Sequence, residues 1–265
     1  MPELPDVEVA RRRLKRWLVR AVVTAAKCSD AHLTRPDPAS RFAKVLVGRT
    51  VEGVARKGKW LRLELSDGGK VFSHLGMTGD WVRVPVDASP VRFERARIDV
   101  ARSGKALAVR YVDARRFGRL VAALDDIDDW TALGPDPLAD GIDVPRLSGL
   151  FAKSRRSVKE ILMDQRVLAG VGNILANEAL WDARLDPRST GKALLPEDAC
   201  SLARAVQVAI RRELGEGTPY RSEQESRFRV YGRGGEPCPR CRHRLTTSTL
   251  GGRSTVYCPH CQIRR

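Results

Sequence analysis

The first residues of the chain combine a secondary amine with a carboxyl group, and together these groups can carry out covalent chemistry. Removal of Met1 would leave Pro2 as the N-terminus, with an α-amino group that titrates near ~8 and is partly neutral at physiological pH. A neutral amine can attack a carbonyl carbon and form a Schiff base, and Glu3 could transfer protons. The alternative is that Pro2 is an ordinary second residue and that Pro5 only begins a helix. On these residues alone that alternative is favoured.

Four cysteines near the C-terminal end have the spacing of a metal site. Cys238 and Cys241 form one C-x2-C pair, Cys258 and Cys261 form a second, and 16 residues separate the pairs. This spacing is typical of tetrahedral zinc sites. We therefore predict one Zn²⁺ ion with four cysteine ligands, and we expect it to be structural because no position is left for water. Disulfides are the alternative, and a reducing compartment disfavours them.

The histidines and cysteines outside this ligand set receive less specific interpretations. His243 and His260 lie beside the cysteine pairs but are not needed as zinc ligands. Cys28 and Cys200 stand alone in the sequence and are predicted to be ordinary buried thiols.

Lys59 has the same parity as the alternating leucines Leu61, Leu63 and Leu65, so it is expected to point to the inner face at the start of a strand. An inward lysine at a sheet rim usually extends its ammonium group to solvent. The second possibility is a cation directed into a cleft.

Two loops, 74–79 and 113–118, place Met77 and Phe117 beside arginines such as Arg115. Exposed apolar side chains of this kind suit insertion into a base stack. The alternative, that Met77 and Phe117 only cap the core, is equally compatible with the sequence.

The surrounding pattern predicts the elements that position these residues. A helix of about a dozen residues is expected from Pro5 onward, with acidic residues in its first turn. From about 20 to 130 the sequence alternates in short strands, including a hairpin that turns at 103–104, and this indicates an antiparallel sandwich or barrel. A Pro- and Gly-rich segment at 133–141 indicates a linker. Helices are expected beyond it at 145–151, 158–163, 174–180 and 196–214.

The turn at 170–173 lies between two of these expected helices. Its glycines and Asn173 open a helix, and the turn is predicted to offer free backbone N–H groups and the Asn173 side chain to a phosphate. A helix–turn–helix with purely structural glycines is the alternative.

The charge of the chain indicates its partner. A formal net charge of +16 over 265 residues and a pI near 10.2 exclude an ordinary metabolic enzyme and imply a polyanion, nucleic acid first and an anionic membrane surface second. Arginines and lysines crowd the segment where a signal peptide would have its apolar region, and no apolar run reaches membrane-spanning length. We expect a cytoplasmic protein, associated with the nucleoid when bound to DNA, with reduced cysteines.

Together these residues resemble the formamidopyrimidine-DNA glycosylase and endonuclease VIII family of base-excision repair enzymes, over essentially the whole chain. The matching segments are 2–8, 57–59, 74–77, 115–118, 133–135, 170–173, 230–233 and 252–255. The resemblance implies an α+β protein. An N-terminal antiparallel β-sandwich with flanking helices would occupy 1–133, a linker 134–145, a helix-two-turn-helix domain 146–232 and a β-hairpin zinc finger 233–265.

The resemblance also implies functions for the candidate residues in a glycosylase with abasic-site lyase activity. Pro2 would attack C1′ of the damaged nucleotide, Glu3 would donate and accept protons around the sugar, and Lys59 and Arg253 would support strand cleavage. The DNA-contacting residues would be Met77, Arg115 and Phe117 in the gap left by the flipped base, Asn173 with Arg253 on the flanking phosphates, and, by charge alone, Arg95, Lys153 and Arg155. The partner would be damaged double-stranded DNA, bound by a monomer without contact to a membrane.

Three departures from the family pattern bear on the choice of lesion. Asp6 stands where glutamate is usual, and Ala114 stands where proline is usual. The loop at 218–230 is shorter than the one that covers an extruded 8-oxoguanine in typical members. A short loop resembles the endonuclease VIII branch, which prefers oxidised pyrimidines, so that preference is an alternative. A zinc-ribbon protein that binds nucleic acid without catalysis is a second alternative, but it does not account for Pro2, Glu3 and Lys59 occurring together.

Overall fold

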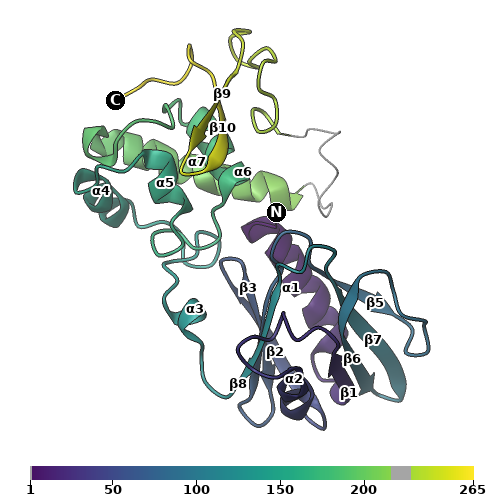
Figure 1. Ribbon diagram of the computed structural model, residues 1–265. Helices are drawn as coiled ribbons and strands as arrows, with labels where there is room; N and C mark the ends of the chain where they lie inside the picture. The colour runs from purple at the N-terminus through teal and green to yellow at the C-terminus, as the bar shows by residue number, and fades with distance from the viewer. Residues whose placement is uncertain (1, 216–227) are drawn as a thin grey trace. The chain divides into compact units, whose positions relative to one another are not determined.

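The structure is a computed structural model that describes residues 2–215 and 228–265 and divides the chain into two compact units (Figure 1). Unit 1 comprises residues 1–2 and 6–132, and unit 2 comprises residues 3–5 and 133–265. Most of the short loop expected at 218–230 lies outside the described residues. The finer division of the chain at residues 133, 145 and 232 stays a prediction.

Unit 1 is built on two antiparallel sheets of four strands each. The first sheet has the order β1 (Val22–Cys28), β6 (Glu94–Arg102), β7 (Lys105–Val112) and β5 (Asp80–Val84). The second has the order β2 (Val51–Lys57), β3 (Trp60–Leu65), β4 (Lys70–His74) and β8 (Arg119–Ala123). Three helices accompany the sheets: α1 (Leu4–Leu18), α2 (Ala39–Leu46) and the short α3 (Asp128–Thr131). The α2 helix contacts β1 of one sheet and β4 and β8 of the other (Figure 1).

One apolar core joins α1 to both sheets of unit 1. Val7 and Leu14 on α1 are buried in the same cluster as Leu63 of β3 and Val109 of β7. Burial of one such side chain contributes roughly 1.5–3 kcal/mol relative to exposure. The helical spacing seen in the sequence is therefore the stripe that attaches α1 to the sandwich, and the predicted α+β sandwich is confirmed.

Glu8 is the buried acid on α1, with its side chain 6% exposed. Arg11 on the same helix donates two hydrogen bonds to its carboxylate, and Arg12 on that helix and Arg56 of β2 donate one each. Burial raises the pKa of Glu8, but the hydrogen bonds from these three arginines outweigh burial and lower the pKa from 4.5 to about 2. The pair of elements α1 and β2 is thus held together by an ionised carboxylate.

We expect Glu8→Gln to lower the free energy of unfolding at neutral pH by roughly 3 kcal/mol, since the native state favours the ionised form. The stabilisation by Glu8 is fully present above the unfolded-state pKa of 4.5 and is lost as the pH falls towards about 2. Urea unfolding of the native protein and the variant should therefore give a difference that is constant above pH 4.5 and shrinks below it. Glu52→Gln, at an exposed site on β2, is the control. A difference that does not change with pH would contradict this assignment.

Two tight hairpins differ in how well the sequence predicted them. The β6–β7 hairpin turns at Ser103 and Gly104, with φ angles of 50° and 74°, as predicted. The β2–β3 hairpin pairs Lys57 with Trp60, so Gly58 and Lys59 form its two-residue turn. The prediction that Lys59 lies at the start of a strand is therefore wrong by one position. Lys59 is half-buried at the tip of the turn.

Unit 2 contains four α-helices, a short 3₁₀ helix and one β-hairpin in its described residues (Figure 1). The helices are α4 (Val144–Ala152), α5 (Val158–Met163), α6 (Asn173–Asp182), η1 (Gly191–Ala193) and α7 (Pro196–Gly215), and the hairpin strands are β9 (Thr246–Leu250) and β10 (Arg253–Tyr257). Ser157 and Glu160 form a capping box at the start of α5. The α6 helix contacts both α7 and β10. The predicted helical domain with a cysteine-bearing hairpin is confirmed.

Cys28 is buried, as predicted, but Cys200 is exposed, so the prediction of a buried thiol is wrong there. The α7 helix buries the stripe that contains Leu202, Val206 and Ala209, and this stripe leaves Cys200 on the solvent side. Among the described residues, no helix has both the length and the apolar composition needed to cross a membrane.

Candidate functional site

The carboxylate of Glu3 caps the N-terminus of α6. Its Oε2 accepts hydrogen bonds from the backbone N–H groups of Gly172 at 3.1 Å and Leu175 at 3.0 Å, and its Oε1 accepts one from Ile174 at 2.8 Å. Glu3 is only 2% exposed. The first N–H groups of a helix have no partner within the helix and favour negative charge. Glu3 supplies both the acceptors and the charge.

Gly172 is required for this contact because a Cβ at that position would overlap the Glu3 carboxylate. The same turn also holds the next residue, since the Leu4 N–H donates to the Gly170 carbonyl at 3.1 Å. The turn at 170–173 was predicted to offer free N–H groups to a phosphate. That prediction is wrong for two N–H groups of the turn, because Gly172 donates to Glu3 and Gly170 donates to the Gln165 side chain at 2.9 Å.

Pro2 is half-buried and directly precedes this anchored pair of residues. It lies outside the helical hydrogen bonds of α1, which begins at Leu4. Because Glu3 and Leu4 are both bonded to the turn at 170–173, the covalently attached Pro2 has little freedom to fray. The Pro2 nitrogen is therefore held in place by the hydrogen bonds of the two residues that follow it, Glu3 and Leu4.

Lys59 acts electrostatically on His74 at the end of β4. Burial, followed by the charges of Lys59 and Arg119, lowers the pKa of His74 from 6.5 to about 4. His74 is therefore neutral at physiological pH, and its Nδ1 accepts a hydrogen bond from the Gly76 N–H at 3.1 Å. The His74 ring also lies 5.1 Å from the Trp60 ring, centroid to centroid. A neutral histidine thus shapes the loop that follows it and adds no further positive charge beside Lys59.

A fully buried aspartate joins the two loops that the sequence singled out. Asp113 accepts hydrogen bonds from the Thr78 hydroxyl at 2.5 Å and from the N–H groups of Arg115 at 3.2 Å and Gly118 at 2.8 Å. Gly76 has a φ of +63°, and a Cβ there would overlap the backbone of Phe117. The loops 74–79 and 113–118 therefore form one connected surface.

Phe117 projects from this surface and is 52% exposed, so it does not cap the core. The Arg115 guanidinium lies 4.9 Å from the centroid of its ring. Met77, on the neighbouring loop, is half-buried. The surface thus presents an aromatic ring and a cation on a backbone that buried hydrogen bonds hold in place.

Arg95, predicted as a DNA contact, also holds this surface together. Its Nε donates to the Asp113 carbonyl at 3.0 Å, and it lies 3.9 Å from the Asp30 carboxylate. Arg116 donates two hydrogen bonds to the same carboxylate at 2.6 and 2.8 Å, and these bonds keep the pKa of Asp30 below its usual value. Two arginines that share one aspartate retain a local positive charge.

The other predicted cations of unit 2 are exposed. Lys153 follows α4, Arg155 lies in the next loop and Arg253 begins β10. Asn173 is half-buried at the first position of α6, where its carbonyl and Oδ1 accept from the Asn177 side chain at 2.6 and 3.3 Å. The side chains of Lys153, Arg155 and Arg253 are accessible to a polyanion from solvent. The Asn173 side chain is partly engaged in hydrogen bonds within its helix.

Two residues that the sequence reasoning missed fix the strand that carries Arg253. Lys159 is fully buried, and its Nζ donates to the Ser254 carbonyl at 2.9 Å and to the Thr255 hydroxyl at 2.6 Å. Burial is the main cause that lowers the pKa of Lys159 to about 8. The Asn177 Oδ1 accepts from the Val256 N–H at 2.7 Å. Both residues could have been found in the sequence, because each is a polar residue, a lysine or an asparagine, within a largely apolar helical stretch.

Glu178 is a third residue that the sequence reasoning missed, and it binds the backbone of residues 229–231. Its carboxylate is 1% exposed. It accepts from the N–H groups of Arg229 at 3.0 Å, Val230 at 2.9 Å and Tyr231 at 3.0 Å, and from the Arg212 guanidinium at 2.8 Å. This buried acid sits on α6, one residue after Asn177.

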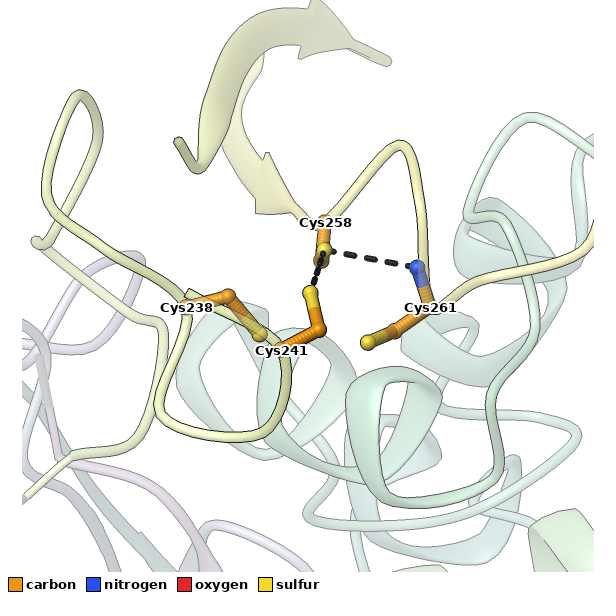
Figure 2. Close-up of side chains that lie close together, drawn as sticks. All are labelled: Cys238, Cys241, Cys258 and Cys261. Carbon is orange, nitrogen blue, oxygen red and sulfur yellow. Dashed lines mark hydrogen bonds between the residues drawn. The ribbon is translucent and has the colours of Figure 1, made fainter. Parts of the chain in front are cut away.

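The four cysteines predicted as zinc ligands lie together, with all four sulfur atoms within 4.8 Å of one another (Figure 2). The Sγ atoms of Cys241 and Cys258 are 3.4 Å apart, and the Trp181 indole N–H donates to the Cys238 sulfur at 3.4 Å. Zn–S bonds of about 2.3 Å in a tetrahedron place neighbouring sulfurs about 3.8 Å apart. The donor set fits one structural Zn²⁺ ion, as predicted.

Comparisons with known proteins cover the whole length of the chain. Residues 1–120 match the family model described as the formamidopyrimidine-DNA glycosylase N-terminal domain, residues 133–222 match the corresponding H2TH domain, and residues 235–263 match a zinc finger shared with IleRS. The formamidopyrimidine-DNA glycosylase of Chloroflexus aurantiacus is 34% identical over 99% of this chain and 98% of that protein.

Solved structures of the Lactococcus lactis formamidopyrimidine-DNA glycosylase are also similar. Its complex with DNA containing an abasic site has a TM-score of 0.88, at 27% identity over 98% of this chain and 99% of that chain. Its complex with DNA containing an oxidised pyrimidine has a TM-score of 0.89, at the same identity and coverage.

Proposed function

Because the chain belongs to the formamidopyrimidine-DNA glycosylase family and is thus a DNA glycosylase of base excision repair, we propose that it excises oxidised bases and then cleaves the strand. The bases are of the 8-oxoguanine and formamidopyrimidine type, and the partner is damaged duplex DNA. The observation that carries the proposal is the anchoring of Glu3 by three backbone N–H groups beside Pro2. A non-enzymatic zinc-ribbon binder is excluded by the family.

Pro2 is the proposed nucleophile once Met1 has been removed. Its nitrogen donates a lone pair to C1′ of the damaged nucleotide, and the bond from C1′ to the base breaks as the base leaves with the electron pair and takes up a proton. Loss of the amine proton and opening of the sugar ring leave an iminium between C1′ and the proline nitrogen. A secondary amine is suited to this step because its iminium is cationic without further protonation.

Glu3 is the proposed proton donor and acceptor around the sugar. In the structure it faces three N–H donors, so it begins as an ionised acceptor. Removal of a C2′ proton from the iminium expels the 3′ phosphate, and a second elimination expels the 5′ phosphate. Lys59 would stabilise negative charge near the lesion, and exposed Arg253 would grip a phosphate and supply a proton in the second elimination.

The surface formed by the loops 74–79 and 113–118 is proposed to fill the gap left by the flipped base. Base flipping costs a few kcal/mol of stacking, and exposed Phe117 with Arg115 above its ring can replace part of that stacking. Met77 would fill the gap beside them. Arg95, Lys153, Arg155 and Asn173 are proposed to contact the backbone.

We expect Phe117→Ala to weaken binding to lesion-containing duplex by about tenfold, since stacking of one base on an aromatic ring contributes about 1–3 kcal/mol. Thermal stability should hardly change, because the ring is 52% exposed. Fluorescence anisotropy titration measures the affinity. Phe93→Ala is a matched control: Phe93 is 42% exposed, and the Arg92 guanidinium lies 4.5 Å from its ring centroid. Equal losses in the two variants would argue against a wedge role for Phe117.

The proposed substrate is tested by incubating the protein with matched duplexes that carry 8-oxoguanine, a formamidopyrimidine or thymine glycol. Release of the two purine lesions at least about tenfold faster than release of thymine glycol supports the proposal. The reverse order would support the alternative, an endonuclease VIII-like preference for oxidised pyrimidines. The similar Lactococcus lactis protein has been crystallised with DNA that contains an oxidised pyrimidine. Because binding of such DNA does not distinguish the two preferences, the rates of base release must be compared. Action as a monomer also stays a prediction.

A further inference from the structure

Two histidines beside the four-cysteine site have no part in the proposed reaction. His243 follows Cys241 by two residues, and His260 lies between Cys258 and Cys261. Their rings stack with centroids 4.1 Å apart and an interplanar angle of 6°. Both side chains are exposed. The two cysteine turns thus bring two imidazoles together on the solvent side of the zinc site.

These imidazoles lie within reach of a third donor. Each of the three residues has one possible ligand atom, and these atoms lie within 4.8 Å of one another: an imidazole nitrogen of His243, one of His260, and the Cys241 sulfur. Imidazole nitrogen is a good ligand for nickel, copper and zinc. Because both rings are exposed, rotation about their side-chain bonds can turn their lone pairs towards one point without repacking a core.

Charge also favours a cation at this place. Four thiolates around one Zn²⁺ ion carry a formal charge of −2, and a thiolate can hold two metal ions at once. A second divalent ion bound to two neutral imidazoles and the Cys241 sulfur would bring the group to neutrality. Arg242 and Arg244 on the same turn oppose this attraction, so the ligands must bind directly for the site to fill.

We propose that His243, His260 and Cys241 form a second metal site for a divalent transition metal ion, next to the structural zinc. The ion would be held by two imidazole nitrogens and would share the Cys241 sulfur with the zinc. The site does not depend on the proposed reaction, and its ligands are exposed, so the ion would enter from solvent and exchange freely.

The proposal is tested by titrating the zinc-loaded full-length protein with NiCl₂ in an isothermal calorimeter. Nickel suits imidazole, whereas tetrahedral thiolate sites favour zinc, so the structural ion should stay in place. A chromogenic chelator records any released zinc, and near-ultraviolet absorption records a bond between thiolate and nickel. The variants are the double substitution His243→Ala with His260→Ala, and His32→Ala, which removes an exposed histidine of unit 1.

We expect one equivalent of nickel to bind without zinc release and with a thiolate-to-nickel absorption band. The double variant should retain one zinc and bind nickel at least about tenfold more weakly, while His32→Ala should bind as the native protein does. Unchanged nickel affinity in the double variant would overturn the site. Release of one zinc for each nickel bound, or the absence of the absorption band, would overturn it as well. The retained zinc of the double variant shows that its hairpin is folded.

Discussion

Pro2→Gly is expected to reduce borohydride trapping on a duplex with an abasic site by at least about a hundredfold, as small misplacements of a reacting group can do. Borohydride reduces the iminium between protein and sugar to a stable amine, so the covalent adduct measures the intermediate directly. Glycine leaves a primary amine, whose imine must be protonated before it is equally reactive. It also lacks the ring that fixes the nitrogen relative to the anchored Glu3 and Leu4.

DNA affinity of the Pro2→Gly variant should stay within about twofold of the native value, because the positive charge and the exposed side chains are unchanged. Intact mass must first show that Met1 has been removed from both proteins, since a retained methionine blocks the amine. If trapping and affinity fall together, Pro2 has a structural role and the nucleophile lies elsewhere. If trapping persists at the native rate, the proposed chemistry fails.

Glu3→Gln is expected to have two separable effects. The amide NH₂ would face backbone donors where the carboxylate accepted three hydrogen bonds, and the loss of a charge-assisted bond costs about 1.5–3 kcal/mol of stability. The amide also cannot carry protons, so the single-turnover rate of base release should fall by on the order of 10²–10⁴. Urea unfolding and quench-flow kinetics measure the two effects independently.

Glu178→Gln is the matched control for this variant. Glu178 is also buried, and it also accepts three backbone hydrogen bonds, from residues 229 to 231. A purely structural effect should therefore lower stability and rate similarly in both variants. We expect similar losses of stability but a rate of base release in Glu178→Gln within about threefold of the native value. Equal losses of rate would show that the acid at position 3 only supports α6.

The sequence predicted much of the fold because its signals are local. The stripe of Val7, Leu14 and Leu18 marked the helix that packs on the sandwich, and Ser103-Gly104 marked a turn that needs positive φ angles. The cysteine spacing predicted the metal site, and the β-hairpin expected within 233–265 lies between its two cysteine pairs. Each of these patterns lies within about 25 residues of chain.

Contacts between distant residues could not be predicted in this way. Glu3 is 169 residues before Gly172, and no local pattern shows that its carboxylate accepts from the N–H groups of Gly172 and the first turn of α6. Lys159 and Ser254 are 95 residues apart, and the burial of Asp113 depends on a second loop. Lys59 lies one position before the strand because the pairing of Lys57 with Trp60 leaves it in a two-residue turn, although Leu61, Leu63 and Leu65 are buried as their alternation predicted.

The α6 helix has a further consequence for how the site responds to motion. Its N-terminus holds Glu3, Asn177 holds the strand of Arg253, and Glu178 holds residues 229–231. At a rise of 1.5 Å per residue, positions 173 to 178 span only about 8 Å of one rigid rod. A displacement of the rod carries all three attachments together, so their mutual spacing survives thermal movement.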